Sequence, residues 1–374
     1  MIQQNSIIEA LSSAQKIAFS PFVFQATVAA KRLGILQCLA DHPTGLTVNE
    51  IADATHLTPY AVQVVTELLT AADVTAVTED RLTLTKTGDC LLLDTMTSVN
   101  LDFTADVCYR GLDHLQEALT TGTAAGLKEL GNWTDTIYPH LFELSPRAKA
   151  SWFGFDHFYS DGAFRNCARW LKKNVAPKRL FDVGGNTGKF AGVALREMPD
   201  LCVKIIDLPQ QCRLAEENSD LADVRTRLTT AAVNWLDPEA LPETDEKADL
   251  VWMSQFLDCF TPDQAVSILT RMKAFLAPGG RIAVLECLWD RQSYEAARLS
   301  LLGTSLYFTA IPAFSPEKNS ARFFLGQDSR LNKRKIGWGC RIRFSYADRR
   351  TNDAVLLSRF LCRPAGLHRR RCRS

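Results

Sequence analysis

The sequence predicts an α/β protein in which a Rossmann-like, doubly wound parallel sheet follows an α-helical winged-helix domain. Three observations predict this fold. A strand, a glycine-rich turn and a helix follow one another over residues 180–196. Buried strands then alternate with helices up to residue 286, which is the order that βαβ units give. Before them, residues 47–85 have the pattern of helix, helix and hairpin.

The first expected domain covers residues 1–95. Helical spacing of apolar residues begins at Phe22 and continues to Leu39. Thr47 and Glu50 have the spacing of a capping box and open a short helix. Thr58-Pro59 starts the next helix, with proline at the first helical position. A hairpin of residues 74–77 and 81–85 completes a winged helix.

This winged helix is a poor candidate for DNA binding. Residues 57–73, where a recognition helix would lie, contain no Lys or Arg. Attraction to phosphate supplies most of the non-specific affinity for DNA, so a helix without basic residues reads DNA poorly. We therefore expect no nucleic-acid partner and a role in dimerisation.

Residues 96–170 are expected to form a helical connector that also contributes to a substrate pocket. Most of its many aromatic residues are expected to pack against neighbouring helices. The dense aromatic cluster at residues 152–159 could instead form the wall of a pocket for a flat, apolar molecule. The substrate-binding candidates are Phe155, His157, Phe158 and Tyr159.

The glycine-rich turn is the strongest indication of a ligand. Gly184, Gly185 and Gly188 follow a strand that ends near Asp182, and glycine allows bare backbone to approach a ligand. Asp207 ends the next strand, where a carboxylate suits the two hydroxyls of a ribose. The turn therefore predicts a nucleotide site; a tight turn without a ligand is the alternative.

The following βα units place more polar residues beside this turn. Strands are expected at residues 227–230, 249–253 and 282–285, with a helix over residues 262–276. In a doubly wound sheet, ligands bind at the carboxyl ends of the strands. The polar residues expected at these ends are Asp182, Asp207, Asn234, Ser254 and Glu286.

Several motifs together resemble the S-adenosylmethionine-dependent O-methyltransferases of the acetylserotonin and caffeate type. They are Asp-Val-Gly-Gly-Asn-Thr-Gly, Ile-Asp-Leu-Pro, Asn-Trp-Leu-Asp-Pro, the Pro-Gly-Gly turn and Val-Leu-Glu-Cys. The resemblance covers about residues 15–312. It implies a winged-helix dimerisation domain, a homodimer, an S-adenosyl-L-methionine-binding methyltransferase domain over residues 171–312, and a small-molecule substrate with a hydroxyl group, aromatic or polyketide-like.

The resemblance also implies roles for residues of this chain. The three glycines hold the methionine part of the cofactor, Asp207 holds the ribose, and Asn234 and Trp235 flank the adenine. The other cofactor-binding candidates are Asp182, Leu208 and Ser254.

The family's general-base histidine is replaced here by Asp258, while Glu286 matches the glutamate that positions the base. Asp258 is a shifted base, a polar anchor for the substrate, or a cap for the next helix. His114 and His157 could also supply a base, although packed histidines are the more common case.

Two other functions remain open at this stage. The missing histidine is compatible with an enzyme of this fold that has impaired or different chemistry. The winged helix is compatible with a regulator that senses a small ligand. The methyltransferase explains more of the motifs.

The composition gives weaker indications. No apolar run reaches the roughly 18 residues that span a bilayer, and the N-terminus does not resemble a signal peptide, so we expect a cytoplasmic protein without a membrane partner. The 11 cysteines contain no Cys-x-x-Cys pair, which argues for reduced, mostly buried thiols and against a metal site.

The segment of residues 313–374 differs from the rest of the chain. It holds 16 Lys or Arg against 4 Asp or Glu, a net charge of +12, whereas residues 1–312 carry −11. It is a basic extension, a divergent replacement for the last strands of the fold, or the product of a shifted reading frame. Arg341–Tyr346 is the strand predicted within it.

Overall fold

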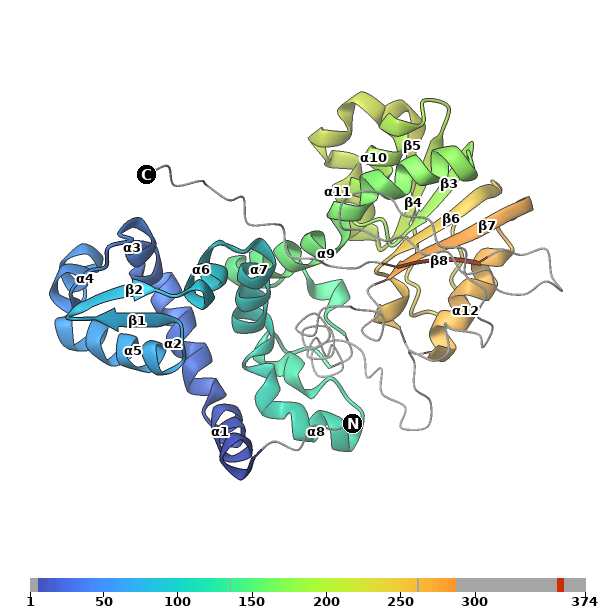
Figure 1. Cartoon of the computed structure of the whole chain (residues 1–374). Helices are drawn as coiled ribbons and strands as arrows, with labels where there is room; N and C mark the ends of the chain where they lie inside the picture. Colours follow the sequence, from blue (N-terminus) through green and yellow to red (C-terminus); the bar gives the residue numbers. More distant parts are fainter. Residues whose placement is uncertain (1–5, 135, 261, 287–354, 360–374) are drawn as a thin grey trace. The chain divides into compact units, whose positions relative to one another are not determined.

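The fold is described from a computed structural model, which describes residues 6–134, 136–260, 262–286 and 355–359 (Figure 1). The chain divides into two compact units, with the change from the first to the second between Val107 and Cys108. This division falls inside the segment that the sequence assigns to a connector. The domain limits at residues 95, 170 and 312 stay predictions.

The first unit consists of short helices around a two-stranded hairpin. Gly34, with a φ of +83°, separates the second helix from the third, so the apolar pattern that begins at Phe22 is divided between two helices. The elements are α1 (Ile7–Ala18), α2 (Ser20–Arg32), α3 (Ile35–Asp41), α4 (Val48–Thr55), α5 (Pro59–Ala71), β1 (Thr75–Thr78), β2 (Arg81–Leu84), α6 (Lys86–Leu93) and α7 (Thr95–Phe103).

Local sequence signals set the helix starts in this unit. The capping box at the start of α4 is confirmed, because Thr47 Oγ1 accepts from Glu50 N and Glu50 Oε2 accepts from Thr47 N. Thr58 caps α5 through the backbone of Ala61, with proline in the first turn. The predicted hairpin is also confirmed, since β1 and β2 pair antiparallel. The helices α4 and α5 and the hairpin of β1 and β2 thus follow one another in the order of a winged helix.

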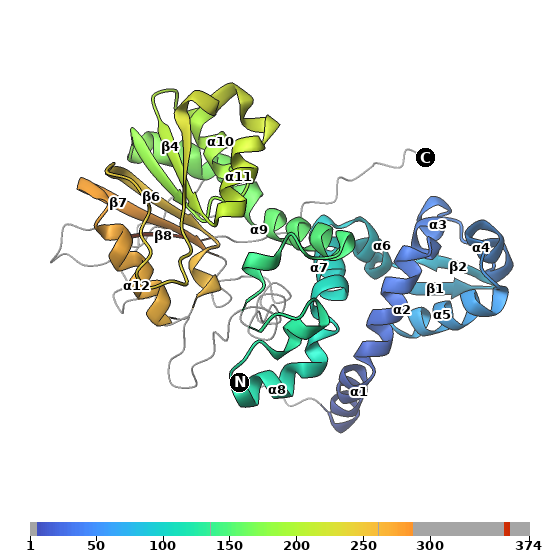
Figure 2. The same ribbon diagram turned by 180° about the vertical axis from the view of Figure 1, so that it is seen from behind.

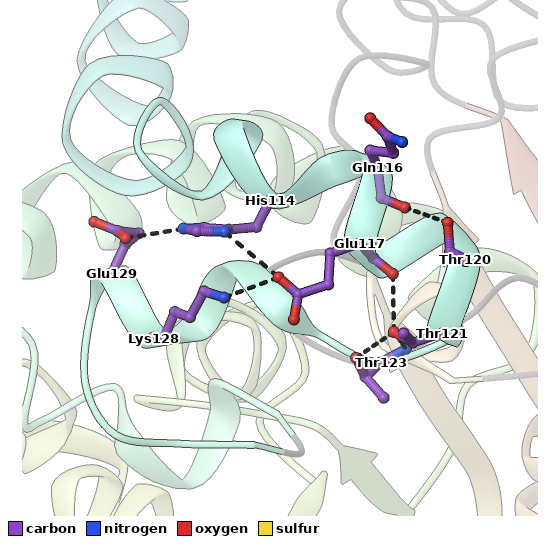
Figure 3. A network of polar contacts seen from close by, with 8 residues as sticks. All are labelled: His114, Gln116, Glu117, Thr120, Thr121, Thr123, Lys128 and Glu129. Atoms are coloured by element: carbon purple, nitrogen blue, oxygen red, sulfur yellow. Dashed lines mark hydrogen bonds and ion pairs between the residues drawn. The ribbon is translucent and has the colours of Figure 1, made fainter.

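The second unit begins with irregular helical segments: η2 (Gly111–His114), α8 (Leu115–Thr121), η3 (Ala125–Glu129), η4 (Tyr138–His140) and the long α9 (Pro146–Asn174). Figure 3 shows the polar contacts that join the first three. His114 Nε2 lies 2.9 Å from Glu129 Oε1, and Lys128 Nζ lies 2.8 Å from Glu117 Oε2. His114 is thus a partner of surface carboxylates here.

A parallel sheet forms the rest of this unit, as predicted. Its strands are β3 (Arg179–Val183), β4 (Cys202–Asp207), β5 (Leu228–Ala232), β6 (Ala248–Ser254), β7 (Leu276–Glu286) and β8 (Val355–Arg359). The strand order is β5-β4-β3-β6-β7-β8, and each neighbouring pair is parallel. The chain order changes direction between β3 and β6. This is the topological switch point, where ligands bind in such sheets.

Helices cover both faces of the sheet, as Figures 1 and 2 show. Alternate residues of β3 point to opposite faces, so Leu180 and Phe181 belong to different core clusters. The cluster around Leu180 includes residues of α9 and of α10 (Lys189–Glu197). The cluster around Phe181 includes residues of α12 (Pro262–Lys273). The remaining helical segments are η1 (Thr104–Cys108), α11 (Pro209–Glu217), η5 (Ser219–Arg227) and η6 (Leu257–Cys259).

Two details differ from the sequence prediction. The helix expected to reach Leu276 ends at Lys273, because β7 already begins at Leu276 and pairs with Ala248. The predicted strand Arg341–Tyr346 lies outside the described residues. The sequence analysis did not predict β8, the edge strand beside β7. Its Val355-Leu356-Leu357 is a short apolar run in the basic segment.

The described residues contain no helix with the length and apolarity to cross a bilayer. The seven cysteines in this part of the chain are free thiols. Cys108, Cys167 and Cys212 are buried, whereas Cys90 and Cys202 are exposed. Burial of the thiols is therefore less general than the sequence suggested.

Candidate active site

The carboxyl ends of the central strands bring the predicted polar residues to one edge of the sheet. Val183 of β3 pairs with Met253 of β6, so the glycine turn starts beside Ser254. Asp207 ends β4 on one side, and Glu286 ends β7 on the other. Residues that are far apart in the sequence thus meet at the switch point.

The glycine turn has the tight geometry that the sequence predicts. Gly184 and Gly188 have φ angles of +71° and +81°, and Asn186 between them has a φ of +50°. Gly184 N donates to Ile206 O, which ties the turn to the end of β4. A Cβ on Gly184 would lie 2.3 Å from Phe256 Cδ2, and one on Gly185 would lie 2.9 Å from Asp182 Cγ. Packing inside the domain already requires glycine at these two positions.

We predict that Gly184→Ala lowers the free energy of unfolding by about 2 kcal/mol or more, because the new Cβ meets Phe256 and alanine disfavours a positive φ. Urea unfolding measures the change. Gly154→Ala is the matched control, since Gly154 is exposed in α9 and a Cβ there meets nothing within 4 Å. The control should be neutral or slightly stabilising, and an equal loss in both variants would contradict the prediction.

Asp207 is held at the end of β4 by two backbone donors. Its Oδ2 accepts from Asn186 N at 2.8 Å, and its Oδ1 accepts from Leu208 N at 2.7 Å. Each carboxylate oxygen can accept a second hydrogen bond, so both oxygens can still bind ligand hydroxyls. Desolvation raises the pKa of Asp207 to about 6. The carboxylate is therefore ionised and oriented near neutral pH.

Four polar atoms near the same strand ends are buried and have no hydrogen-bond partner among the residues that the structure describes: Asp182 Oδ2, Asn186 Oδ1, Ser254 Oγ and Glu286 Oε2. Leaving a buried polar atom unpaired costs about 1–3 kcal/mol. Burial, and then the charge of Asp207, raise the pKa of Asp182 to about 8, so this carboxyl is mainly protonated near neutral pH and can donate. A polar ligand with both donors and acceptors fits this set of atoms.

The loop after β5 carries Asn234 and Trp235. Asn234 is exposed and its Oδ1 accepts from Leu236 N, whereas the Trp235 side chain is 4% exposed. The Arg271 guanidinium lies 5.0 Å from the centre of the Trp235 ring and donates to the Trp235, Asp237 and Ala240 carbonyls. Arg271 therefore fixes this loop. The sequence gives no sign of this role, because Arg271 lies on a helix about 35 positions away.

Asp258 and Glu286 lie close enough to influence each other's ionisation. Glu286 Oε1 accepts from the backbone N–H groups of Phe256 and Leu257 at 3.2 and 3.1 Å, which fixes the start of η6. Burial and the charge of Asp258 raise the pKa of Glu286. Asp258 reaches solvent, yet desolvation by the surrounding protein raises its pKa too. Two neighbouring carboxyl groups share a proton more readily than isolated ones do, because two negative charges close together repel each other.

Tyr138 and Cys259 also lie near Asp258. Neither was predicted from the sequence to be a site residue. Tyr138 Oη donates to Cys259 Sγ at 2.8 Å, and Cys259 Sγ lies 3.6 Å from Asp258 Oδ1. The Tyr138 ring packs edge-on against Trp152, with 6.0 Å between ring centres. Two aromatic side chains, Tyr138 and Trp152, therefore contact each other near Asp258, and Tyr138 precedes the cluster of residues 152–159 that the sequence singled out.

The predicted substrate residues on α9 have mixed surroundings. Phe155 and Phe158 are partly buried. His157 stacks on Phe153 and its Nδ1 lies 3.7 Å from Asp161, so it has local partners. The side chain of Tyr159 lies outside the described residues. Asp156, which the sequence analysis did not single out, contacts the glycine turn through Asn186.

Comparison with known proteins gives two domain matches. Residues 12–82 match a Dimerisation2-like domain, and residues 173–320 match an O-methyltransferase domain. The second match ends inside the basic segment. The three interpretations of the basic segment stay predictions: an extension, a replacement for the last strands, or a frame-shifted product.

Individual proteins agree with these matches. The 3-hydroxy-5-methyl-1-naphthoate 3-O-methyltransferase of Streptomyces sahachiroi is 31% identical over 40% of this chain, which spans only 42% of that relative. The bacteriochlorophyllide d C-20 methyltransferase of Chlorobaculum tepidum is 22% identical over 83% of this chain and 89% of its own length. The structure of human N-acetylserotonin methyltransferase in complex with SAM has the same fold, with a TM-score of 0.53 and 19% identity over 83% of this chain and 88% of that one. The chain therefore matches a Dimerisation2-like domain followed by an O-methyltransferase domain, and it shares the fold of this methyltransferase structure.

Proposed function

We propose that the protein transfers a methyl group from S-adenosyl-L-methionine to a hydroxyl of a small aromatic or polyketide-like molecule. The observation that carries this proposal is the group of unpaired, buried polar atoms around the glycine turn and Asp207 at the switch point. They offer donors and acceptors to a ligand with a ribose and an amino-acid part. When bound, this cofactor supplies an electrophilic methyl group on sulfur.

We assign the residues that hold the cofactor from the family resemblance and from their places at the strand ends. Gly184, Gly185 and Gly188 face the amino-acid part, with Asp182 and Ser254 as further polar contacts. Asp207 binds the ribose hydroxyls, beside Leu208. Asn234 and Trp235 lie at the adenine end, where Arg271 fixes their loop.

Asp258 is the residue that takes the proton from the acceptor hydroxyl. Positioning of the hydroxyl does much of the work in such an in-line displacement, and a base adds about 10²- to 10⁴-fold. An ordinary aspartate is too weak a base for a phenol, but desolvation makes Asp258 more basic, and Glu286 fixes the segment that carries it. The side chains of Phe155, His157 and Phe158 on α9 then line the acceptor site.

An assay with cofactor labelled on its methyl group tests this function. The acceptor panel contains simple phenols and hydroxynaphthoates, because one relative is named as a hydroxynaphthoate O-methyltransferase. We expect label in a product whose hydroxyl has become a methyl ether. The methyl ether of each acceptor is the control and should receive no label. If the cofactor binds but no hydroxyl compound is methylated, the protein is an enzyme of this fold with other chemistry.

The chain also carries a surface suited to a homodimer, which we propose forms through α1 and α2. None of the residues of α1 is buried, although Ile8, Leu11 and Ile17 are 75%, 57% and 75% exposed. Phe19 and Phe22 extend this apolar surface into α2, with 5.9 Å between their ring centres. A helix of 12 residues is marginal alone in water, so a second copy of the chain is the partner that this surface fits.

We predict that the double variant Ile8→Asp with Leu11→Asp weakens the dimer by about 10⁴-fold or more, since the dimer then loses four apolar side chains, two from each copy, and burying each contributes roughly 1.5 kcal/mol or more. Light scattering after size exclusion over a dilution series measures the dissociation constant. Leu241→Asp, at an exposed position in the second unit, is the control and should leave the dimer intact. A dimer of unchanged strength in the double variant would place the interface elsewhere.

A further inference from the structure

A contact between α9 and the glycine turn is not explained by the roles given so far. Asp156 Oδ2 accepts from Asn186 Nδ2 at 3.0 Å, while the backbone N–H of Asn186 donates to Asp207. Asn186 lies in the middle of the turn with a φ of +50°, a conformation that asparagine tolerates better than most residues. Asn186 therefore joins α9 to the acid at the end of β4.

The contact fixes which way the Asn186 amide faces. An ionised carboxylate only accepts hydrogen bonds, so Asp156 selects the amide orientation in which Nδ2 faces it. Asn186 Oδ1 then lies on the other branch of the amide, where it is buried and has no partner. Asp156 thus holds the Asn186 amide so that Oδ1, inside the glycine turn, is an acceptor without a partner among the described residues.

The charges around this acceptor favour a cationic donor. The carboxylates whose charges act on Asp156 are Asp258, Asp161 and Asp207. The nearby ammonium of Lys189 is already paired with Asp161, at 2.8 Å. A positively charged ligand group gains more here than a neutral hydroxyl does.

We propose that Asp156 is a positioning residue that orients Asn186, so that Asn186 Oδ1 accepts a hydrogen bond from the ammonium group of the cofactor's amino-acid part. This inference rests on the proposed function. It assigns to α9 a role in cofactor binding in addition to its expected contact with the acceptor.

Calorimetry with two ligands tests the proposal. S-adenosylhomocysteine carries the amino-acid part, whereas 5′-methylthioadenosine has the same nucleoside without it. We expect Asp156→Ala to weaken binding of S-adenosylhomocysteine by about tenfold, the value of one hydrogen bond to a charged group. Binding of 5′-methylthioadenosine should change by less than about twofold, which also shows that the variant is folded. Equal losses for both ligands, or no loss, would overturn the proposal.

Two further variants separate orientation from charge. Asp156→Asn removes the charge but keeps an amide oxygen that can accept from Asn186 Nδ2, so it should bind within about threefold of the original protein. If it loses as much as Asp156→Ala, the charge of Asp156 acts directly and the proposed orientation is wrong. Asp156→Ala combined with Asn186→Ala should lose no more than Asn186→Ala alone, because both residues act through one contact.

A matched control comes from the same two elements. Glu197→Gln breaks the Arg169–Glu197 pair between α9 and α10, whose side chains are 60% and 25% exposed, and should leave both affinities nearly unchanged. If the original protein binds neither ligand, the proposed function itself fails. If it binds both and Asp156→Ala does not distinguish them, only the present inference fails.

Discussion

Asp207→Ala is expected to weaken binding of S-adenosylhomocysteine by about 100-fold or more. In the proposed site, the substitution removes two charge-assisted hydrogen bonds to the ribose, each worth about 1.5 kcal/mol or more, and a factor of 100 corresponds to about 2.7 kcal/mol. It also removes the acceptor of Asn186 N and Leu208 N, so the glycine turn loses its anchor on β4. Both the ligand contact and the shape of the site depend on this carboxylate.

Calorimetry with the purified variant measures this loss. Glu217→Ala, which removes an exposed acid at the end of α11, is the control for the change of charge and should bind normally. Thermal unfolding without ligand shows whether the Asp207 variant keeps its fold. An affinity within threefold of the original protein in a folded variant would exclude Asp207 as the ribose anchor.

Asp258→Asn is expected to lower kcat by about 100-fold while leaving the affinity for S-adenosylhomocysteine unchanged. The amide cannot take the proton from the acceptor hydroxyl, and loss of a general base costs about 10²- to 10⁴-fold. The original protein should also lose activity as the pH falls through the pKa of Asp258, because only the carboxylate acts as base. That pKa is raised by desolvation, so the loss begins at a higher pH than for an ordinary aspartate.

The dependence of kcat on pH separates this role from the others left open for Asp258. With Asp258→Asn the acidic limb should disappear together with most of the rate. Asp263→Asn is the matched control, since Asp263 is exposed in the first turn of α12. Unchanged turnover would remove Asp258 from the chemistry and leave it as a cap, whereas a raised KM with normal kcat would make it an anchor for the substrate.

Local patterns account for the parts of the fold that the sequence predicted. The capping box at Thr47, the proline at the start of α5 and the hairpin of β1 and β2 each depend on residues within a few positions of one another. The same holds for the glycine turn, where Gly184 and Gly188 have the positive φ that glycine permits. Where the pattern is weaker, prediction failed: β8 is short and lies within a basic segment, so its apolar residues did not stand out.

The sequence by itself determined the order of the strands from β3 to β7, the tight turn, and the acids that end β4 and β7. Periodicity and turn chemistry are encoded over short distances, which is why these features can be recognised without coordinates. Only the tertiary structure decided that Asp156 meets Asn186, that Tyr138 meets Cys259, and that Arg271 holds the loop of Trp235. These partners are about 30 to 120 positions apart, and the packing of α9, η4 and α12 around the sheet is what brings them into contact.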